Sequence, residues 1–280
     1  MNILNILVLA IVQGVAELLP VSSSAHVIMA EKLLGLDPTS PQMTFLLVML
    51  HTGTMFAVIA YFWQSWHARF FSSKAAFVET VKLVVVATVA TGVVGLALVF
   101  LIEKVVLRGS QHAEIEQLFG NTYVIASGLA AAGVLILVSG LRKAPSGPLS
   151  VARSAWIGAV QGLCLPFRGF SRSGATISTG MLLGVERIRA EEFSFALAVV
   201  LTPAVIAKEG LRLLKDQAQA PGGLHDLASL VGPALLGMVL SFVAGWLALR
   251  WLSKWLEQGR WFLFGPYCLA ASVLVLLFGR

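Results

Sequence analysis

Six apolar runs in this 280-residue chain are each long enough to cross a lipid bilayer, and they constrain the fold more than any other feature of the sequence. A transmembrane helix needs about 20 mostly apolar residues. Only 12% of the residues are charged, roughly half of what a soluble domain carries. The sequence therefore predicts an all-α integral membrane protein with six transmembrane helices. The runs lie at about 44–64, 82–102, 122–141, 192–210, 231–250 and 262–279.

Four further apolar segments are too short to cross a bilayer, and they occur as two pairs. Each pair is interrupted by Pro, Gly, Ser or a charged residue. Non-helical backbone at membrane depth is tolerated only where protein or a water-filled cavity satisfies it. We therefore expect two re-entrant helix-loop-helix hairpins, with tips near 20–24 and 166–173. The paired segments are about 3–16 with 21–30, and about 154–167 with 175–185.

A weak internal repeat relates the two halves of the chain. The run AIVQGV at 10–15 recurs as GAVQGL at 158–163. Likewise TFLLVMLHTG at 44–53 recurs loosely as SFALAVVLTP at 194–203. The two matches have nearly equal offsets, which favours duplication over chance.

The repeat predicts one membrane domain made of two related halves, about 1–141 and 150–280, joined by a basic linker at 142–153. Each half would hold one hairpin and three crossings. An odd number of crossings inverts the second half relative to the first. The two hairpins would then enter from opposite faces, and their tips would meet near the midplane.

The distribution of Lys and Arg predicts the orientation. On this topology, one side of the membrane carries eleven of the 20 basic residues and the other carries seven. The positive-inside rule makes the richer side cytoplasmic, which places both termini outside. The net charge of +6 is spread between apolar runs instead of forming a basic face, so we expect membrane lipids as partners and no nucleic acid.

The first hairpin contains an unusual density of polar chemistry in the stretch QGVAELLPVSSSAH. Gln13 and Glu17 are four residues apart and share one helical face. Pro20 ends that helix, and a serine can cap the next one, whose free N-terminal amides favour an anion. His26 lies in the first turn or so of that second helix. The serines of this tip are Ser22, Ser23 and Ser24.

The second hairpin contains LCLPFRGFSRSGATIS, from 163 to 178. Arg168 and Arg172 carry guanidinium groups, the side chains best shaped to grip phosphate oxygens. Ser171 and Ser173 offer hydroxyls, and a helix starting at about Gly174 would add backbone amides. Together the two tips fit phosphoryl transfer on a substrate with a phosphate head and a lipid tail.

Several other polar residues have simpler interpretations. His51, in the middle of a predicted span, is typical of a packed histidine bonded to a neighbouring helix, with a supporting role in the site as the alternative. The ERIRAEE run at 186–192 is typical of a solvated loop. The two cysteines, Cys164 and Cys268, have no metal-ligand spacing and form no disulfide framework.

The two motifs resemble the signatures of the bacterial undecaprenyl-diphosphate phosphatase family, the bacitracin-resistance proteins. QGVAELLPVSSSAH resembles a pattern of the form EGxTExLPxSSTGH, and GFSRSGATIS resembles PGxSRSGATxS. The resemblance extends over the whole chain in length, number of apolar segments and motif position. It implies hydrolysis of undecaprenyl diphosphate to undecaprenyl phosphate and phosphate, which recycles the lipid carrier of peptidoglycan synthesis and confers bacitracin resistance.

The resemblance also implies roles for individual residues in an inner-membrane enzyme open to the periplasm. Glu17, Ser23, His26 and Arg172 match the motif positions that carry the catalysis. Phosphate contacts would come from Ser22, Ser24, Arg168, Ser171, Ser173 and Gly174. The sequence leaves open whether Ser23 or His26 attacks phosphorus, and whether Glu17 acts as a base or as a ligand to Mg²⁺ or Ca²⁺.

The chain departs from the family pattern at Gln13, where the first motif glutamate is replaced by an amide. Arg168 is an additional arginine upstream of the second motif. Because losing a carboxylate harms hydrolysis more than lipid movement, an undecaprenyl phosphate transporter on the same scaffold is the competing interpretation. The sequence is equally compatible with a homodimer and a monomer.

Overall fold

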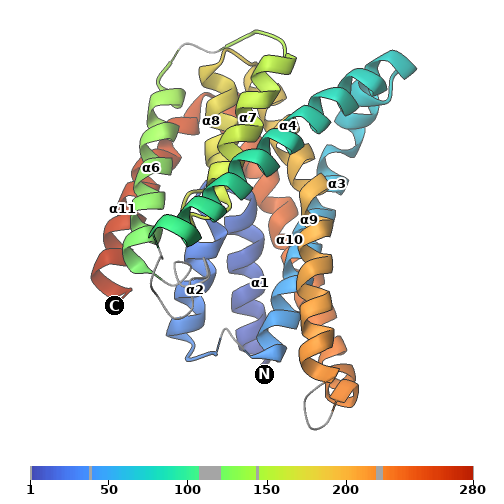
Figure 1. Ribbon diagram of the computed structural model, residues 1–280, viewed down its shortest axis with the longest axis vertical. Helices are drawn as coiled ribbons and strands as arrows, with labels where there is room; N and C mark the ends of the chain where they lie inside the picture. The colour runs from blue at the N-terminus through green and yellow to red at the C-terminus, as the bar shows by residue number, and fades with distance from the viewer. Residues whose placement is uncertain (1, 38–39, 107–120, 143–144, 219–222, 280) are drawn as a thin grey trace.

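The computed structural model describes all residues except 1, 38–39, 107–120, 143–144, 219–222 and 280. Its described regular elements are helices, as predicted (Figure 1). A π-helical turn at Ile102–Val106 extends α4, and a 3₁₀ turn at Arg260–Leu263 precedes α11. The α-helices are α1 Ile3–Leu18, α2 Ser23–Leu33, α3 Pro41–Phe70, α4 Lys74–Leu101, α6 Thr122–Gly140, α7 Val151–Cys164, α8 Arg172–Leu182, α9 Arg187–Ala218, α10 Gly223–Glu257 and α11 Phe264–Phe278.

Six helical segments of the described chain are long and apolar enough to cross a membrane, one for each predicted run. Most extend beyond the predicted limits, because polar and aromatic residues continue the helices past the apolar stretches. The segments are Gln42–Phe70, Lys74–Val105, Thr122–Gly140, Arg187–Leu211, Val231–Glu257 and Arg260–Phe278.

The four short apolar segments form two packed helix pairs, α1 with α2 and α7 with α8. In Figure 1, α1 rises from the lower end of the molecule and α2 returns toward it, while α7 descends from the upper end and α8 returns upward. The connections, 19–22 and 165–171, lie between these ends. The two chain termini are at the lower end (Figure 1).

The segments related by the internal repeat lie on helices that run in opposite directions in Figure 1. AIVQGV is part of the rising α1, and GAVQGL is part of the descending α7. TFLLVMLHTG is part of the rising α3, and SFALAVVLTP is part of the descending α9. The matching segments therefore run in opposite directions, α1 against α7 and α3 against α9.

The long helices pack against the two short pairs and against one another. α10 packs against α1 and α3, α4 packs against α7, and α6 packs against α11. The contact of α4 with α7 depends on Gly158, where an added Cβ would lie 2.1 Å from the carbonyl oxygen of Ala87. The largest buried cluster includes Trp261, Phe195 and Leu249, and it packs around the ends of α1 and α8.

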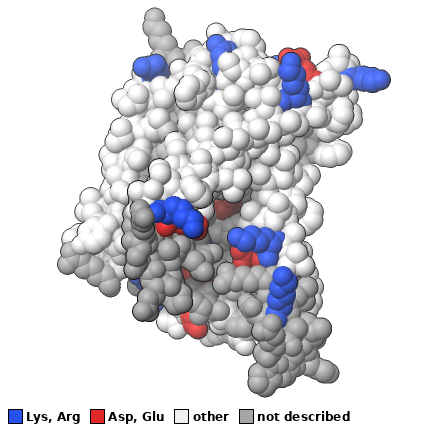
Figure 2. Space-filling view, viewed as in Figure 1, with Lys and Arg blue, Asp and Glu red and all other residues white. Residues whose placement is uncertain are grey.

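Charged side chains are unevenly distributed over the face shown in Figure 2. They lie at the upper end and again from about the middle downward, and an uncharged band lies between these two groups. Large apolar side chains of α4, such as Val89, Val93 and Leu96, are exposed. Such a band is the surface expected against lipid tails.

The interpretation of 186–192 as a solvated loop is wrong. The segment contains the start of α9, where Glu191 and Glu192 are buried. Glu191 accepts a hydrogen bond from Ser253 at 2.6 Å, and Glu192 pairs with Arg69 at 3.1 Å. Hydrogen-bonding and charged partners on α3 and α10 therefore compensate for the burial of these two acids. The charge pattern of 186–192 alone does not indicate these partners.

Candidate functional site

The last turn of α1 positions a carboxylate with three donors around it. Gln13 and Glu17 share one face of α1, and the Gln13 amide donates to Glu17 Oε2 at 3.2 Å. Ser23, at the start of α2, donates to the same oxygen at 2.6 Å. Arg172 donates to the other oxygen, Oε1, at 3.2 Å. This carboxylate is the centre of the cluster.

The first tip returns the chain through a strained residue. α1 ends at Leu18, before Pro20, and Ser22 has a φ of 69°. This left-handed region is unusual for a residue with a Cβ and costs on the order of 1–3 kcal/mol. The carbonyl groups of the two residues that follow α1 accept hydrogen bonds from residues far away in sequence. Ser173 donates to Leu19 O, and Cys268 donates to Pro20 O.

The second tip uses a glycine for its left-handed residue. Gly169 has a φ of +96°, and an added Cβ would lie 2.1 Å from the carbonyl oxygen of Ile125. Ser171 then caps α8, accepting from the backbone N–H of Gly174 at 3.2 Å. Because this cap lies three residues before the predicted start at Gly174, the helix already begins at Arg172.

Arg172 and Glu17 join the two tips in an ion pair. The side chains are 22% and 20% exposed, so the pair is largely withdrawn from solvent. The Arg172 guanidinium carbon lies 5.9 Å above the ring of Phe195 on α9, a cation–π contact that aims the group. Its Nη1 atom is buried with no hydrogen-bond partner among the described residues. One donor of this arginine is therefore left for an acceptor outside the described chain.

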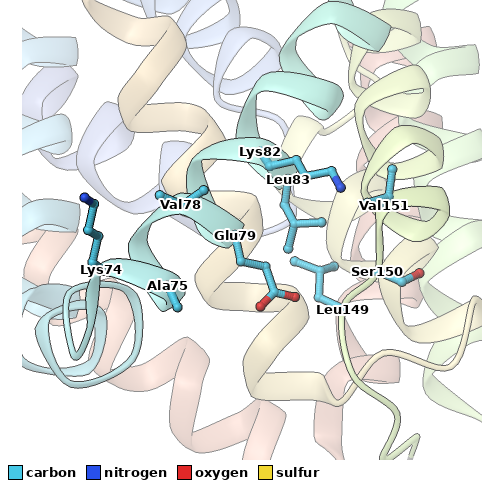
Figure 3. A pocket seen from close by; sticks show the side chains of 9 residues that line it. All are labelled: Lys74, Ala75, Val78, Glu79, Lys82, Leu83, Leu149, Ser150 and Val151. Atoms are coloured by element: carbon cyan, nitrogen blue, oxygen red, sulfur yellow. The ribbon is translucent and has the colours of Figure 1, made fainter.

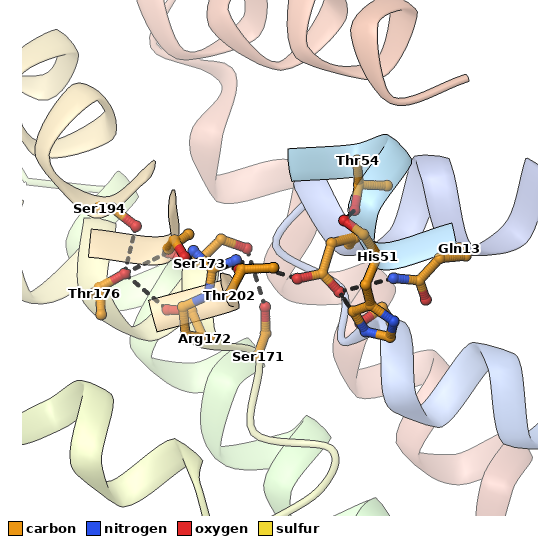
Figure 4. Close-up of polar contacts among 12 residues, drawn as sticks. Gln13, His51, Thr54, Ser171, Arg172, Ser173, Thr176, Ser194 and Thr202 are labelled. Carbon is orange, nitrogen blue, oxygen red and sulfur yellow. Dashed lines mark hydrogen bonds and ion pairs between the residues drawn. The ribbon is translucent and has the colours of Figure 1, made fainter. Parts of the chain in front are cut away.

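The backbone that carries Arg172 is itself supported. Thr176 donates to the carbonyl oxygen of Arg172 at 2.8 Å, and its hydroxyl lies 2.6 Å from that of Ser194. Both side chains are fully buried. Figure 4 shows Arg172 between this hydroxyl pair on one side and Gln13 and His51 on the other. These contacts fix the backbone of Arg172. Its guanidinium group is directed toward Glu17 of the first helix pair.

His26 does not join the Glu17 cluster. Its Nδ1 lies 2.8 Å from Ser22 O, and its Nε2 lies 2.7 Å from the hydroxyl of Tyr267, with the two rings stacked. Ser22 and Ser24 place their hydroxyls 3.3 Å apart, and Ser22 makes no side-chain cap on α2.

Two titratable residues outside the predicted site, His51 and Glu31, lie near residues of the two motif regions. His51 Nε2 lies 3.9 Å from Glu17 Oε2, although His51 is far from both motifs in sequence. Glu31, on α2, is buried, and this burial raises the pKa of its carboxyl to about 7. Arg168 lies close enough for its charge to oppose that pKa shift.

The residues around Glu17 suit a hard cation better than a soft one. Carboxylate, amide and hydroxyl oxygens of Glu17, Gln13 and Ser23 are ligands of the type that Mg²⁺ and Ca²⁺ prefer. The described residues contain no group of three His, Cys, Asp or Glu side chains that could hold a metal. A cation here would therefore complete its shell with substrate phosphate oxygens and water.

A groove of about 880 Å³ lies away from this cluster, at the upper end of α4 (Figure 3). Lys82, Glu79 and Ser150 give it polar edges, and Leu83 and Leu149 line it with apolar surface. None of its lining residues belongs to the Glu17 cluster. It is not part of the candidate site.

The fold and the cluster define a class: a helical membrane protein with a charged polar site where two short helix pairs meet. Within that class, this chain belongs to the bacitracin resistance protein BacA family, whose model matches residues 6–274.

Similar proteins cover nearly the full length of the chain. It is 59% identical to "Undecaprenyl-diphosphatase 2" of Acinetobacter baylyi over 99% of this chain and 98% of the relative. It is 33% identical to "Undecaprenyl-diphosphatase" of Desulfosudis oleivorans, over 97% of each protein. A relative with the same description in Rhodopirellula baltica is 28% identical over 99% of this chain.

Proposed function

We propose that this protein hydrolyses undecaprenyl diphosphate to undecaprenyl phosphate and inorganic phosphate. It would thereby recycle the lipid carrier of peptidoglycan synthesis and confer resistance to bacitracin. The family and the full-length similarity to undecaprenyl-diphosphatases support this activity. The observation that best supports a site at the junction of the two helix pairs is the ion pair of Glu17 with Arg172. These residues are 155 positions apart in sequence.

Arg172 would hold the terminal phosphate of the substrate. Its unpartnered Nη1 is available to a phosphate oxygen, and Nη2 can move from Glu17 to a second oxygen in a bidentate contact. The N-terminus of α2, where Ser22 makes no side-chain cap, would add backbone amides to the same charge. Ser24 lies within the first turn of α2, and Ser171 and Ser173 lie at the start of α8, so their hydroxyls are further candidate phosphate contacts.

Ser23 is the better supported nucleophile. Its hydroxyl already donates to Glu17 at 2.6 Å, so the carboxylate can take the proton as Ser23 attacks the terminal phosphorus. His26 is less suited to attack, because Tyr267 occupies its Nε2. We assign His26 to holding the start of α2 in place. A Mg²⁺ or Ca²⁺ at Glu17, if the enzyme uses one, would neutralise phosphate charge.

The two helix pairs are proposed to be re-entrant hairpins in an inverted repeat. The opposite directions of the repeated helices and the meeting of the two connections support this arrangement. The excess of Lys and Arg among the residues assigned to the upper end supports a cytoplasmic location for that end. The first pair then opens toward the periplasm in the plasma membrane, where it would admit the lipid diphosphate. A homodimer and a monomer both remain compatible with this arrangement.

The test is phosphate release from undecaprenyl diphosphate by purified protein in detergent, with and without Mg²⁺ or Ca²⁺. We expect turnover by the wild-type protein. No release with any cation would contradict the proposed function. Movement of undecaprenyl phosphate across vesicles by a hydrolytically inactive variant would instead support the transporter interpretation.

A further inference from the structure

The groove at the upper end of α4 has an apolar floor that belongs to the folded core. Leu83 of α4 is buried, and Leu149, from the segment before α7, packs against the same cluster. That cluster also contains Phe193 and Leu197 of α9. The volume of about 880 Å³ lies in the range of small-molecule sites. The groove is therefore a formed feature of the protein with room for a ligand.

The rim of the groove is cationic. Lys74 and Lys82 line it from one face of α4, and both are exposed. Figure 3 shows Lys82 extending toward Val151, the first residue of α7. The first turn of α7 has no acidic residue, so its N–H groups add partial positive charge. Glu79 is the acid among the described lining residues, and no ion pair between described residues includes it or either lysine. The rim therefore carries a net positive charge.

Further along α4, the face that carries the two lysines is apolar and exposed. Of the six described membrane-crossing segments, the one that contains α4 has the smallest buried share, 22%. Spacings of three or four residues place its exposed apolar side chains on the same face as Lys74 and Lys82. They extend over about 22 Å of helix, which exceeds the roughly 15 Å of hydrocarbon in one leaflet. These side chains are Val85, Val89, Val93, Leu96 and Phe100.

Aromatic residues place the groove at the level of lipid head groups. Trp156 follows Val151 by five residues on α7 and is 63% exposed. Phe71 and Phe77, on either side of the start of α4, are also exposed, and their rings stack at 5.6 Å. Exposed tryptophan is typical of the membrane–water interface. The lysines then lie at the depth of lipid phosphates, and the apolar face of α4 lies at the depth of the tails.

We propose that this groove binds an anionic phospholipid of the cytoplasmic leaflet, with its phosphate between Lys82 and the start of α7 and its acyl chains along α4. The leaflet follows from the membrane orientation proposed above. Basic pockets between membrane helices on the cytoplasmic side are suited to anionic head groups. A second copy of the chain fits less well. A two-fold axis along the membrane normal would bring Lys74 and Lys82 of both copies to one depth, where like charges repel.

The test measures the lipid that the purified protein retains in detergent, by native mass spectrometry, with phosphatidylglycerol or phosphatidylcholine of the same acyl chains. Lys74→Gln/Lys82→Gln is compared with Arg142→Gln/Lys254→Gln, which removes two exposed charges outside the groove. From the usual contribution of a basic residue near anionic lipid, we expect the first variant to bind phosphatidylglycerol about 10- to 30-fold more weakly. The control should bind it as the wild-type protein does. Equal losses in the two variants, or equal binding of the two lipids by the wild-type protein, would overturn the proposal.

Val78→Trp tests whether the lipid lies in the groove. Val78 lines the groove and is 57% exposed, so a larger side chain would fill the groove without entering the core. We expect this variant to lose phosphatidylglycerol binding with its charges unchanged, and to keep the wild-type unfolding midpoint in lipid-free detergent. Undiminished binding by Val78→Trp would overturn the placement.

The same spectra distinguish the lipid from a protein partner. A dimer that retains no lipid and that Val78→Trp dissociates would assign this face to a second copy and overturn the proposal. Bound lipid would contact α4 and α7 together, so phosphatidylglycerol should also raise the unfolding midpoint of the wild-type protein. Because lipid binding is read by mass, a protein inactive on undecaprenyl diphosphate would refute the proposed function and leave this inference standing.

Discussion

The two helix pairs share a sequence repeat but contribute opposite chemistry. In the first pair Gln13 is followed four residues later by Glu17, and in the second Gln161 is followed by Leu165. Gln13 donates to the Glu17 carboxylate, whereas Gln161 donates to Thr91 at 3.1 Å in a buried contact of α7 with α4. The anion of the site therefore comes from one pair and the cation, Arg172, from the other.

The backbone of the two tips differs in the same way. The second tip meets its left-handed residue with Gly169, beside the backbone of α6, and caps α8 with Ser171. The first tip has Ser22 in the left-handed region, without a side-chain cap on α2. The second pair is thus built as a firm support for Arg172. The first retains strain and free polar groups where substrate would bind, as functional sites often do.

The largest effect is expected from removing the cation of the second pair. Arg172→Ala should lower phosphate release about 100- to 1000-fold, because it removes the donors that would neutralise transition-state charge. Turnover in detergent measures it, with Arg142→Ala, an exposed arginine, as the control. Near-normal turnover by Arg172→Ala would remove the basis for placing phosphate at this junction.

Replacing the repeated glutamines should separate chemistry from packing. Gln13→Leu should lower kcat about tenfold, because a hydrogen bond to a charged group contributes about 1.5–3 kcal/mol. Gln161→Leu should leave kcat within about twofold, since Thr91 still donates to backbone carbonyl groups at 158 and 87. Equal losses of kcat in the two variants would contradict the assignment of Gln13 to the site and of Gln161 to helix packing.

The tips should differ in their response to changes at the left-handed residue. Gly169→Ala should destabilise the fold by about 2 kcal/mol or more, through its positive φ and the clash with Ile125. Ser22→Gly should raise the thermal unfolding midpoint and lower activity, because it relieves strain and removes a site hydroxyl. Unfolding in detergent, followed by tryptophan fluorescence, measures both. A stabilised Gly169→Ala protein would contradict the geometry of the second tip.

The smallest effect is expected at the cap of α8. Ser171→Ala should cost about 1 kcal/mol of stability, because Gly174 loses its acceptor. Ser171→Asp, which can still cap, should keep the stability but disfavour phosphate by its charge. Comparing unfolding midpoints with KM distinguishes these roles. An unchanged midpoint in Ser171→Ala would show that the cap does not hold the helix.

Much of the fold could be predicted from the sequence, because membrane helices are specified by local composition. The six long segments and the two short pairs follow from run length and from breaks such as Pro20 and Gly169. The grouping of Gln13, Glu17 and Ser23 follows from helical spacing and a tight turn. The repeat offset then indicates which distant segment supplies the arginine.

The rest depends on contacts that no local pattern encodes. His51 reaches Glu17 only because α3 packs beside α1, and Tyr267 reaches His26 from α11. The burial of Glu191 and Glu192 depends on partners on α3 and α10. The separation of His26 from the Glu17 cluster also could not be read from the motif, which places it near Ser23 in sequence.

The most direct test of a site shared between the two pairs is a double-mutant cycle on Glu17 and Arg172. Phosphate release would be measured for the wild-type protein, Glu17→Gln, Arg172→Gln and the double variant. Residues that act as a unit are strongly non-additive. We predict that the double variant is no slower than the slower single variant. Losses that simply multiply would contradict a single site assembled from both helix pairs.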